Sequence, residues 1–142
     1  MTAPTPSQTV GPFFGFALTP LDGGGELRDI LRIEGQVLDG AGEPVADALI
    51  EAWHGDALAR CRTDEEGAYH LSIAAAPVVS LTVFARGLLR HLQTRMYLPG
   101  EEDEVLRSVE EARRHTLVSR REGGVLHFDI RLQGPDETVF FA

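Results

Sequence analysis

The stretch LRIEGQVLDG, residues 31–40, decides the fold class of this chain. Ile33, Gly35 and Val37 alternate with polar residues, which is the period of a half-buried β-strand. The Asp39-Gly40 pair that follows is typical of a tight turn. The stretch therefore predicts a β-strand that ends in a turn.

Further short strands are expected along the rest of the chain. Residues 78–85 form an apolar run rich in β-branched side chains, and two other segments alternate between apolar and polar residues. The expected strands after the first are residues 48–53, 69–73, 78–85, 94–98, 126–133 and 138–141. Several short strands separated by turns indicate an all-β sandwich or barrel.

One helix is predicted over residues 101–115. Val105, Leu106, Val109 and Ala112 fall on one face at helical spacing. The segment begins with acidic residues and ends with basic ones, so that both ends complement the helix dipole.

The first 30 residues are predicted to form an irregular arm. They contain four prolines and three consecutive glycines, which interrupt regular structure. The arm also carries Phe13, Phe14 and Phe16, and three neighbouring aromatic side chains are expected to pack against the chain's own domain or a partner. We expect an arm over residues 1–30 and a single β domain over residues 31–142.

Composition limits the classes of function. The chain has 142 residues, enough for one domain, and its net charge of −9 disfavours nucleic-acid binding. The single cysteine excludes an internal disulfide and a multi-cysteine zinc site. No segment has the pattern of a signal peptide or a membrane span, and a free Cys61 suits a reducing compartment, so we expect a cytoplasmic protein without membrane contact.

The histidines and the cysteine are weak candidates for a site. His54 and Asp56 would need further ligands to bind a metal, and none is evident in the sequence. Cys61 is best interpreted as a small buried hydrophobe, although arginines flank it. Among the five histidines, His91 in a polar patch after a strand is the one candidate site residue.

Arg86 is more informative. The segment Phe84-Ala85-Arg86-Gly87 ends the most apolar strand, which places a guanidinium at the rim of a sheet. The planar guanidinium fork suits bidentate binding of a carboxylate. From spacing alone, a structural ion pair with one of the 22 acidic residues is the favoured interpretation.

A set of short motifs, in order along nearly the whole chain, resembles the intradiol ring-cleaving dioxygenases. Together these motifs are specific, although each alone is weak. The motifs are TPSQTVGPF (residues 5–13), EAWHGD (51–56), FARG (84–87), HLQTRMYL (91–98) and ETVFF (137–141). The resemblance implies a β-sandwich of mostly antiparallel strands, with one short helix and the irregular arm.

The resemblance is to the two-chain members of this family, in which a beta subunit binds Fe(III) through two tyrosines and two histidines and the homologous alpha subunit does not. The family's His-x-His pair falls here at Val78 and Ser80, which cannot serve as ligands. Tyr69 and Tyr97 match structural positions of the family, and the loops that carry the ligand tyrosines are short. The resemblance thus implies an alpha subunit without metal or cofactor of its own, in a higher-order alpha–beta oligomer with an iron-binding beta subunit.

Four positions match the family's contribution of the alpha subunit to the active-site wall: Thr9, Gly11, Pro12 and Arg86. Arg86 is implied to bind the carboxylate of an aromatic dihydroxybenzoate, which the holoenzyme cleaves with O2. No catalytic residue is implied in this chain alone, and His91 and Arg95 match the family without an assigned role. The alternative is a transthyretin-like or carboxypeptidase-regulatory-like binding module, which shares the early strand pattern but is not expected to carry the arm.

Overall fold

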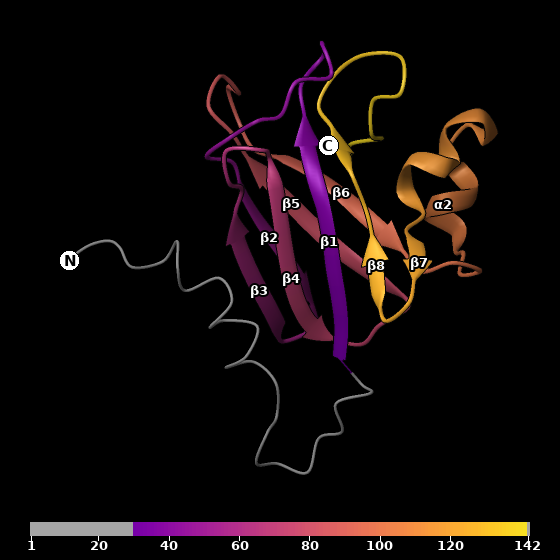
Figure 1. Ribbon diagram of the computed structural model, residues 1–142. Helices are drawn as coiled ribbons and strands as arrows, with labels where there is room; N and C mark the ends of the chain where they lie inside the picture. Colours follow the sequence, from indigo (N-terminus) through magenta and orange to yellow (C-terminus); the bar gives the residue numbers. More distant parts are fainter. Residues whose placement is uncertain (1–29, 142) are drawn as a thin grey trace, which may run out of the picture.

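The computed structural model describes residues 30–141, which form two β-sheets packed face to face (Figure 1). This architecture confirms the predicted β-sandwich. Residues 1–29 of the predicted arm, among them Thr9, Gly11 and Pro12, lie outside the described residues, and its last residue, Ile30, begins the first strand.

Each sheet combines strands that are distant in the sequence. The first contains, in spatial order, β4 (Ala68–Ala74), β1 (Ile30–Leu38), β8 (Val125–His127) and β7 (Arg120–Glu122). A further short strand, β9 (Ile130–Arg131), pairs with β1. The second contains β3 (Ala57–Arg62), β2 (Leu49–His54), β5 (Val78–Phe84) and β6 (Leu92–Tyr97). Neighbouring strands are antiparallel, except that β1 pairs in parallel with β8 and β9.

The core lies between the sheets and follows from the alternation in the sequence. Ile33 on β1, Ile50 on β2 and Leu81 on β5 are fully buried, whereas their neighbours along each strand face outward. Full burial of one such side chain contributes about 1.5–3 kcal/mol to stability. Apolar burial from both sheets therefore holds the sandwich together.

The predicted strand over residues 126–133 is interrupted in the structure. β8 ends at His127, and β9 begins at Ile130. Between them, the Asp129 carboxylate accepts a hydrogen bond from the Gln36 N–H at 2.9 Å. A side chain thus satisfies a donor of β1 that the backbone of a continuous strand would otherwise have paired.

Three further strand predictions need correction. β3 and β7 form strands that the sequence pattern did not predict. Residues 138–141 do not form a strand: among them, only Phe141 makes a bridge, to Gln93 on β6.

The junction after β8 is packed against β1 and β4. The Tyr69 hydroxyl on β4 donates to the Phe128 carbonyl, and burial raises the pKa of Tyr69. A side chain at Gly35 on β1 would overlap that carbonyl oxygen and approach the Tyr69 hydroxyl at 2.9 Å. Gly35 is therefore required by the close approach of two backbones.

The prediction of a single helix over residues 101–115 is wrong. The structure has a short α-helix, α2 (Glu104–Ser108), and a 3₁₀ segment, η2 (Glu111–Leu117), at one edge of the sandwich (Figure 1). Val109 between them is extended and buried, and it packs in one cluster with Leu106 and Leu117. The extended backbone at Val109, with a ψ of 141°, therefore ends α2 and separates it from η2.

We expect Gly35→Ala to lower the free energy of unfolding by more than about 3 kcal/mol, because the new Cβ overlaps the Phe128 carbonyl. Chemical denaturation followed by circular dichroism measures the change. Gly124→Ala is the matched control, since a Cβ there meets no atom within 4 Å and the change should stay within about 0.5 kcal/mol. Similar effects of the two substitutions would contradict the close approach at Gly35.

Candidate functional site

Arg86 lies at the rim of the second sheet, just beyond the end of β5, as the sequence predicted. The turn closes with a hydrogen bond from the Leu88 N–H to the Ala85 carbonyl at 3.2 Å, and Gly87 adopts a φ of 92°. This turn leaves the Arg86 side chain 85% exposed. A ligand or a partner chain can therefore reach its guanidinium.

Asp47 is the acidic neighbour of Arg86. The closest atoms, Arg86 Nη2 and Asp47 Oδ2, are 3.6 Å apart, which exceeds a hydrogen-bond distance. Both side chains are largely exposed, so this ion pair contributes little to stability. The arrangement holds Arg86 loosely and leaves its N–H groups able to bind a carboxylate.

His91 packs beside the same rim. Its ring centroid lies 5.4 Å from that of Phe84, the last residue of β5, in a tilted arrangement. Such an aromatic contact orients the loop between β5 and β6. His91 therefore makes a packing contact with Phe84, which precedes Arg86 by two residues in the sequence.

The positions that match the family's ligand pair do not form a metal site. Val78 and Ser80 lie on the outer face of β5, opposite Tyr97 and Arg95 of β6. Within residues 30–141, no group of three or more His, Cys, Asp or Glu side chains is placed to hold a metal ion. At these two positions the chain therefore offers no imidazole to a metal ion.

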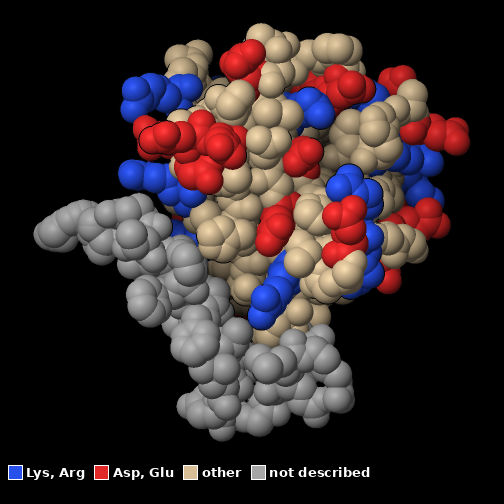
Figure 2. Space-filling model, viewed as in Figure 1, with Lys and Arg blue, Asp and Glu red and all other residues tan. Residues whose placement is uncertain are grey.

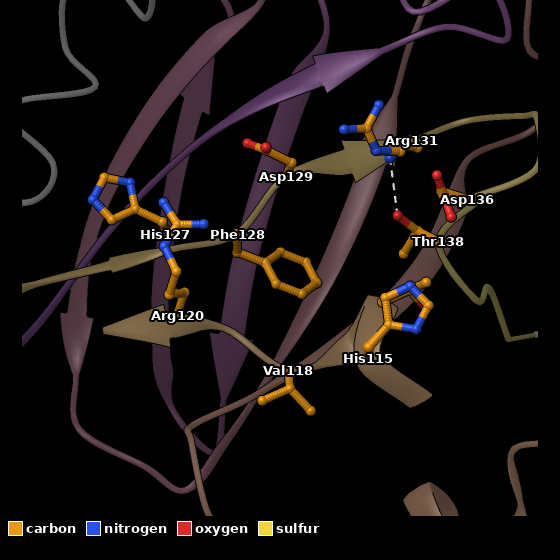
Figure 3. Close-up of a pocket in the computed structure, with 10 residues that line it drawn as sticks. His115, Val118, Arg120, His127, Phe128, Asp129, Arg131, Asp136 and Thr138 are labelled. Carbon is orange, nitrogen blue, oxygen red and sulfur yellow. Dashed lines mark hydrogen bonds between the residues drawn. The ribbon is translucent and has the colours of Figure 1, made fainter. Parts of the chain in front are cut away.

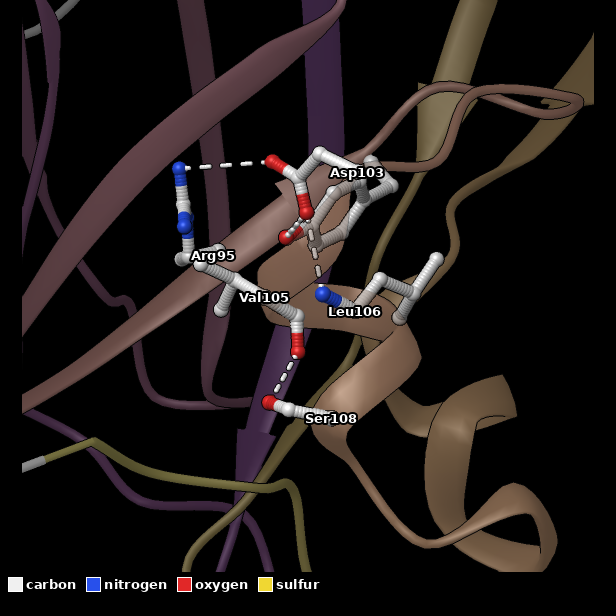
Figure 4. Close-up of polar contacts among 6 residues, drawn as sticks. Arg95, Asp103, Val105, Leu106 and Ser108 are labelled. Carbon is white, nitrogen blue, oxygen red and sulfur yellow. Dashed lines mark hydrogen bonds and ion pairs between the residues drawn. The ribbon is translucent and has the colours of Figure 1, made fainter.

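Tyr97 and Arg95 belong to a polar cluster with Asp103 (Figure 4). The Asp103 carboxylate caps α2 by accepting from the Leu106 N–H at 2.9 Å, and it accepts from the Tyr97 hydroxyl at 2.8 Å. Burial, together with that hydrogen bond, raises the pKa of Tyr97 to about 12. Burial opposes ionisation of Asp103, but the hydrogen bonds and the nearby Arg95 outweigh it and lower the pKa of that carboxyl.

A polar pocket of about 370 Å³ lies between η2, β7 and the C-terminal segment (Figure 3). Phe128 separates Arg120 and His127 on one side from Arg131 and Asp136 on the other. Its lining is His115, Thr116, Val118, Arg120, His127, Phe128, Asp129, Arg131, Asp136 and Thr138. The lining contains two arginines and two aspartates, whose formal charges cancel.

The other polar candidates have structural positions. Cys61 is buried on β3 with its flanking arginines facing outward, and burial raises the pKa of its thiol. His54 Nε2 lies 2.7 Å from the Ala74 carbonyl, which explains its position without a metal. On the face shown in Figure 2, acidic and basic side chains are interspersed. No helix within residues 30–141 is long and apolar enough to cross a membrane.

A second, mostly apolar pocket of about 300 Å³ was not expected from the sequence. Its walls come from five separate segments, and Trp53, Ser80 and Arg95 lie side by side across β2, β5 and β6. The alternation of residues along each strand could have predicted that these three side chains face outward. It could not have predicted that the three strands pair with one another. Arg95, which had no assigned role, therefore lines a pocket.

Solved structures with a similar fold are intradiol-type dioxygenases. The dioxygenase domain of a carbohydrate-binding fusion from Streptomyces sp. SirexAA-E matches with a TM-score of 0.57 and 20% identity, over 74% of this chain and 80% of that one. Catechol 1,2-dioxygenase from Pseudomonas arvilla C-1 matches with a TM-score of 0.56 and 22% identity, over 83% of this chain and 57% of that one. At these identities the similarity shows the fold alone.

Sequence relatives are more specific. No family model matches the chain. The chain is 34% identical to the protocatechuate 3,4-dioxygenase alpha chain of Burkholderia cepacia, over 96% of both chains, and 30% identical to that of Pseudomonas putida, over 96% and 95%. Nothing in these similarities favours the transthyretin-like alternative, and the predicted resemblance is confirmed. The chain belongs to the family of protocatechuate 3,4-dioxygenase alpha chains.

Proposed function

We propose that this chain is the alpha subunit of a heteromeric protocatechuate 3,4-dioxygenase. The holoenzyme would cleave the ring of protocatechuate between its hydroxyl groups with O2, giving 3-carboxy-cis,cis-muconate. The observation that carries this assignment is the similarity to two alpha chains along 96% of this chain. A match over at least 95% of both proteins supports a shared role better than a shared motif does.

A homologous beta subunit is assigned the iron. The positions of this chain that match the family's ligand pair are Val78 and Ser80, whose side chains do not bind Fe(III). The ring-opening chemistry is therefore attributed to the ferric ion of the partner. What this chain contributes is binding and positioning of the substrate at the interface between the subunits.

Arg86 is the residue assigned to the substrate carboxylate. Its exposed side chain and its long contact to Asp47 support this role, since its N–H fork can meet a carboxylate without breaking a strong ion pair. That carboxylate distinguishes protocatechuate from catechol. Thr9, Gly11 and Pro12 of the arm are assigned to the wall of the same pocket.

The arm over residues 1–30 is assigned to the interface with the beta subunit, and residues 31–142 to one β-sandwich domain. Phe13, Phe14 and Phe16 would then be buried against the partner, which removes three aromatic side chains from water. The assembly would be a higher-order alpha–beta oligomer in the cytoplasm, where a free Cys61 remains reduced.

We expect Arg86→Ala in the assembled enzyme to raise the KM for protocatechuate about tenfold, because a charge-assisted hydrogen bond to the carboxylate is lost. The KM for catechol should change less than about twofold on the same principle. Steady-state O2 uptake with both substrates measures the difference.

Arg90→Ala is the matched control, because Arg90 is an exposed arginine on the same loop. It should leave both KM values unchanged. An equal effect of Arg86→Ala on protocatechuate and catechol would remove the carboxylate role from Arg86.

Assembly through the arm has its own test. Co-expression with an iron-binding homologue should give an oligomer that contains both chains, measured by light scattering after size-exclusion chromatography. Phe13→Ser combined with Phe14→Ser should weaken that assembly and leave the circular dichroism of the β-sandwich unchanged, because apolar contact area at the interface is lost. Full assembly of this variant would contradict burial of the arm against the partner.

A further inference from the structure

The apolar pocket of about 300 Å³ on the outer face of the second sheet has the chemistry of a ligand site. Its size lies at the lower end for small-molecule pockets, which suits a ligand with one ring. Its lining is Trp53, Ser80, Leu81, Gln93, Thr94, Arg95, Val105 and Phe141. The pocket therefore combines aromatic walls with one guanidinium, one amide and two hydroxyls.

The guanidinium of Arg95 lies at this pocket, next to the Asp103 carboxylate (Figure 4). Its Nη2 lies 3.7 Å from Asp103 Oδ2, and its Cζ lies 5.8 Å from the centroid of the Tyr97 ring. Asp103 Oδ1 already accepts hydrogen bonds from Tyr97 and Leu106. Because the contact to Asp103 is longer than a hydrogen bond, Arg95 is positioned but keeps N–H donors for a ligand.

Aromatic side chains form another part of the lining. Trp53 is 42% exposed. Its indole N–H donates a hydrogen bond to Thr82 Oγ1 at 3.4 Å, and this contact orients the ring. Phe141 is tied to β6 by a hydrogen bond from its N–H to the Gln93 carbonyl at 2.8 Å. A flat ring beside Trp53 and Phe141 would bury apolar surface that is otherwise exposed to water.

We propose that this pocket binds a small aromatic carboxylate, with the carboxylate on Arg95 and the ring beside Trp53 and Phe141. A guanidinium fork recognises a carboxylate, and aromatic walls recognise the ring. The site goes beyond the function proposed above because it is separate from Arg86. Ser80 lies within β5, whereas Arg86 lies in the turn beyond the end of that strand, and no residue of that turn lines the pocket.

Trp53 is the single tryptophan of the chain and therefore reports on the pocket. Titration of the full chain with benzoate should give a saturable change in its fluorescence. Benzamide, which has the same ring without the charge, should bind at least tenfold more weakly. Equal affinities for benzoate and benzamide would overturn the carboxylate assignment.

Arg95→Gln should weaken benzoate at least tenfold, because the charged donor is lost. Arg62→Gln is the matched control, since Arg62 is an exposed, outward-facing arginine on β3 of the same sheet, and it should bind benzoate as the unmodified chain does. Unchanged affinity of Arg95→Gln would contradict the proposed contact.

A second pair of variants tests the pocket without disturbing the contact to Asp103. Ser80→Leu places a larger side chain in the pocket and should abolish benzoate binding. Ser72→Leu makes the same change at an outward-facing position of β4 in the other sheet and should leave benzoate binding unchanged. Benzoate binding that survives Ser80→Leu would overturn the site.

Equilibrium dialysis of the complex with the iron-binding partner separates a small ligand from a protein contact. The assembled oligomer should bind one benzoate in this pocket per copy of this chain. Ser80→Leu should abolish the binding of that benzoate. Loss of that binding on assembly would overturn the small-molecule assignment and identify the pocket as a seat for a side chain of the partner.

Discussion

The close approach of β1 to the chain at Phe128 is the constraint on which the C-terminal third of the structure depends. Gly35 leaves room for the Phe128 carbonyl, and the Tyr69 hydroxyl donates to it. The chain then continues on β1 as β9 and returns toward β6, where Thr94 Oγ1 donates to the Val139 carbonyl at 2.7 Å. The contact at Phe128 thus directs the segment that supplies Phe141 to the pocket on the other sheet.

Much of the fold could be predicted from the sequence because the sheets alternate between core and solvent. β1 and β5 were predicted within one or two residues, since burial imposes a period of two on each. β3 was missed because its inward residues, Ala59 and Cys61, are small and its outward residues include two arginines. The helix was predicted too long because the spacing of Leu106 and Val109 is helical, whereas Val109 itself adopts an extended backbone and ends α2.

The two sites differ in how far the sequence could predict them. Arg86 lies at the end of a single recognisable strand, so its position at the rim follows from local pattern alone. The pocket at Arg95 needs the lateral order β2-β5-β6 and the return of the C-terminal segment, which are properties of the whole fold. A pattern along one strand carries no information about which strand lies beside it.

The central claim is that this chain binds substrate within an enzyme whose iron belongs to its partner. Metal analysis of the two chains, separated after purification of the assembled oligomer, tests it most directly. We expect ferric iron, with the visible absorption of tyrosinate coordinated to it, in the partner and none in this chain. Stoichiometric ferric iron with that absorption in this chain alone would contradict it.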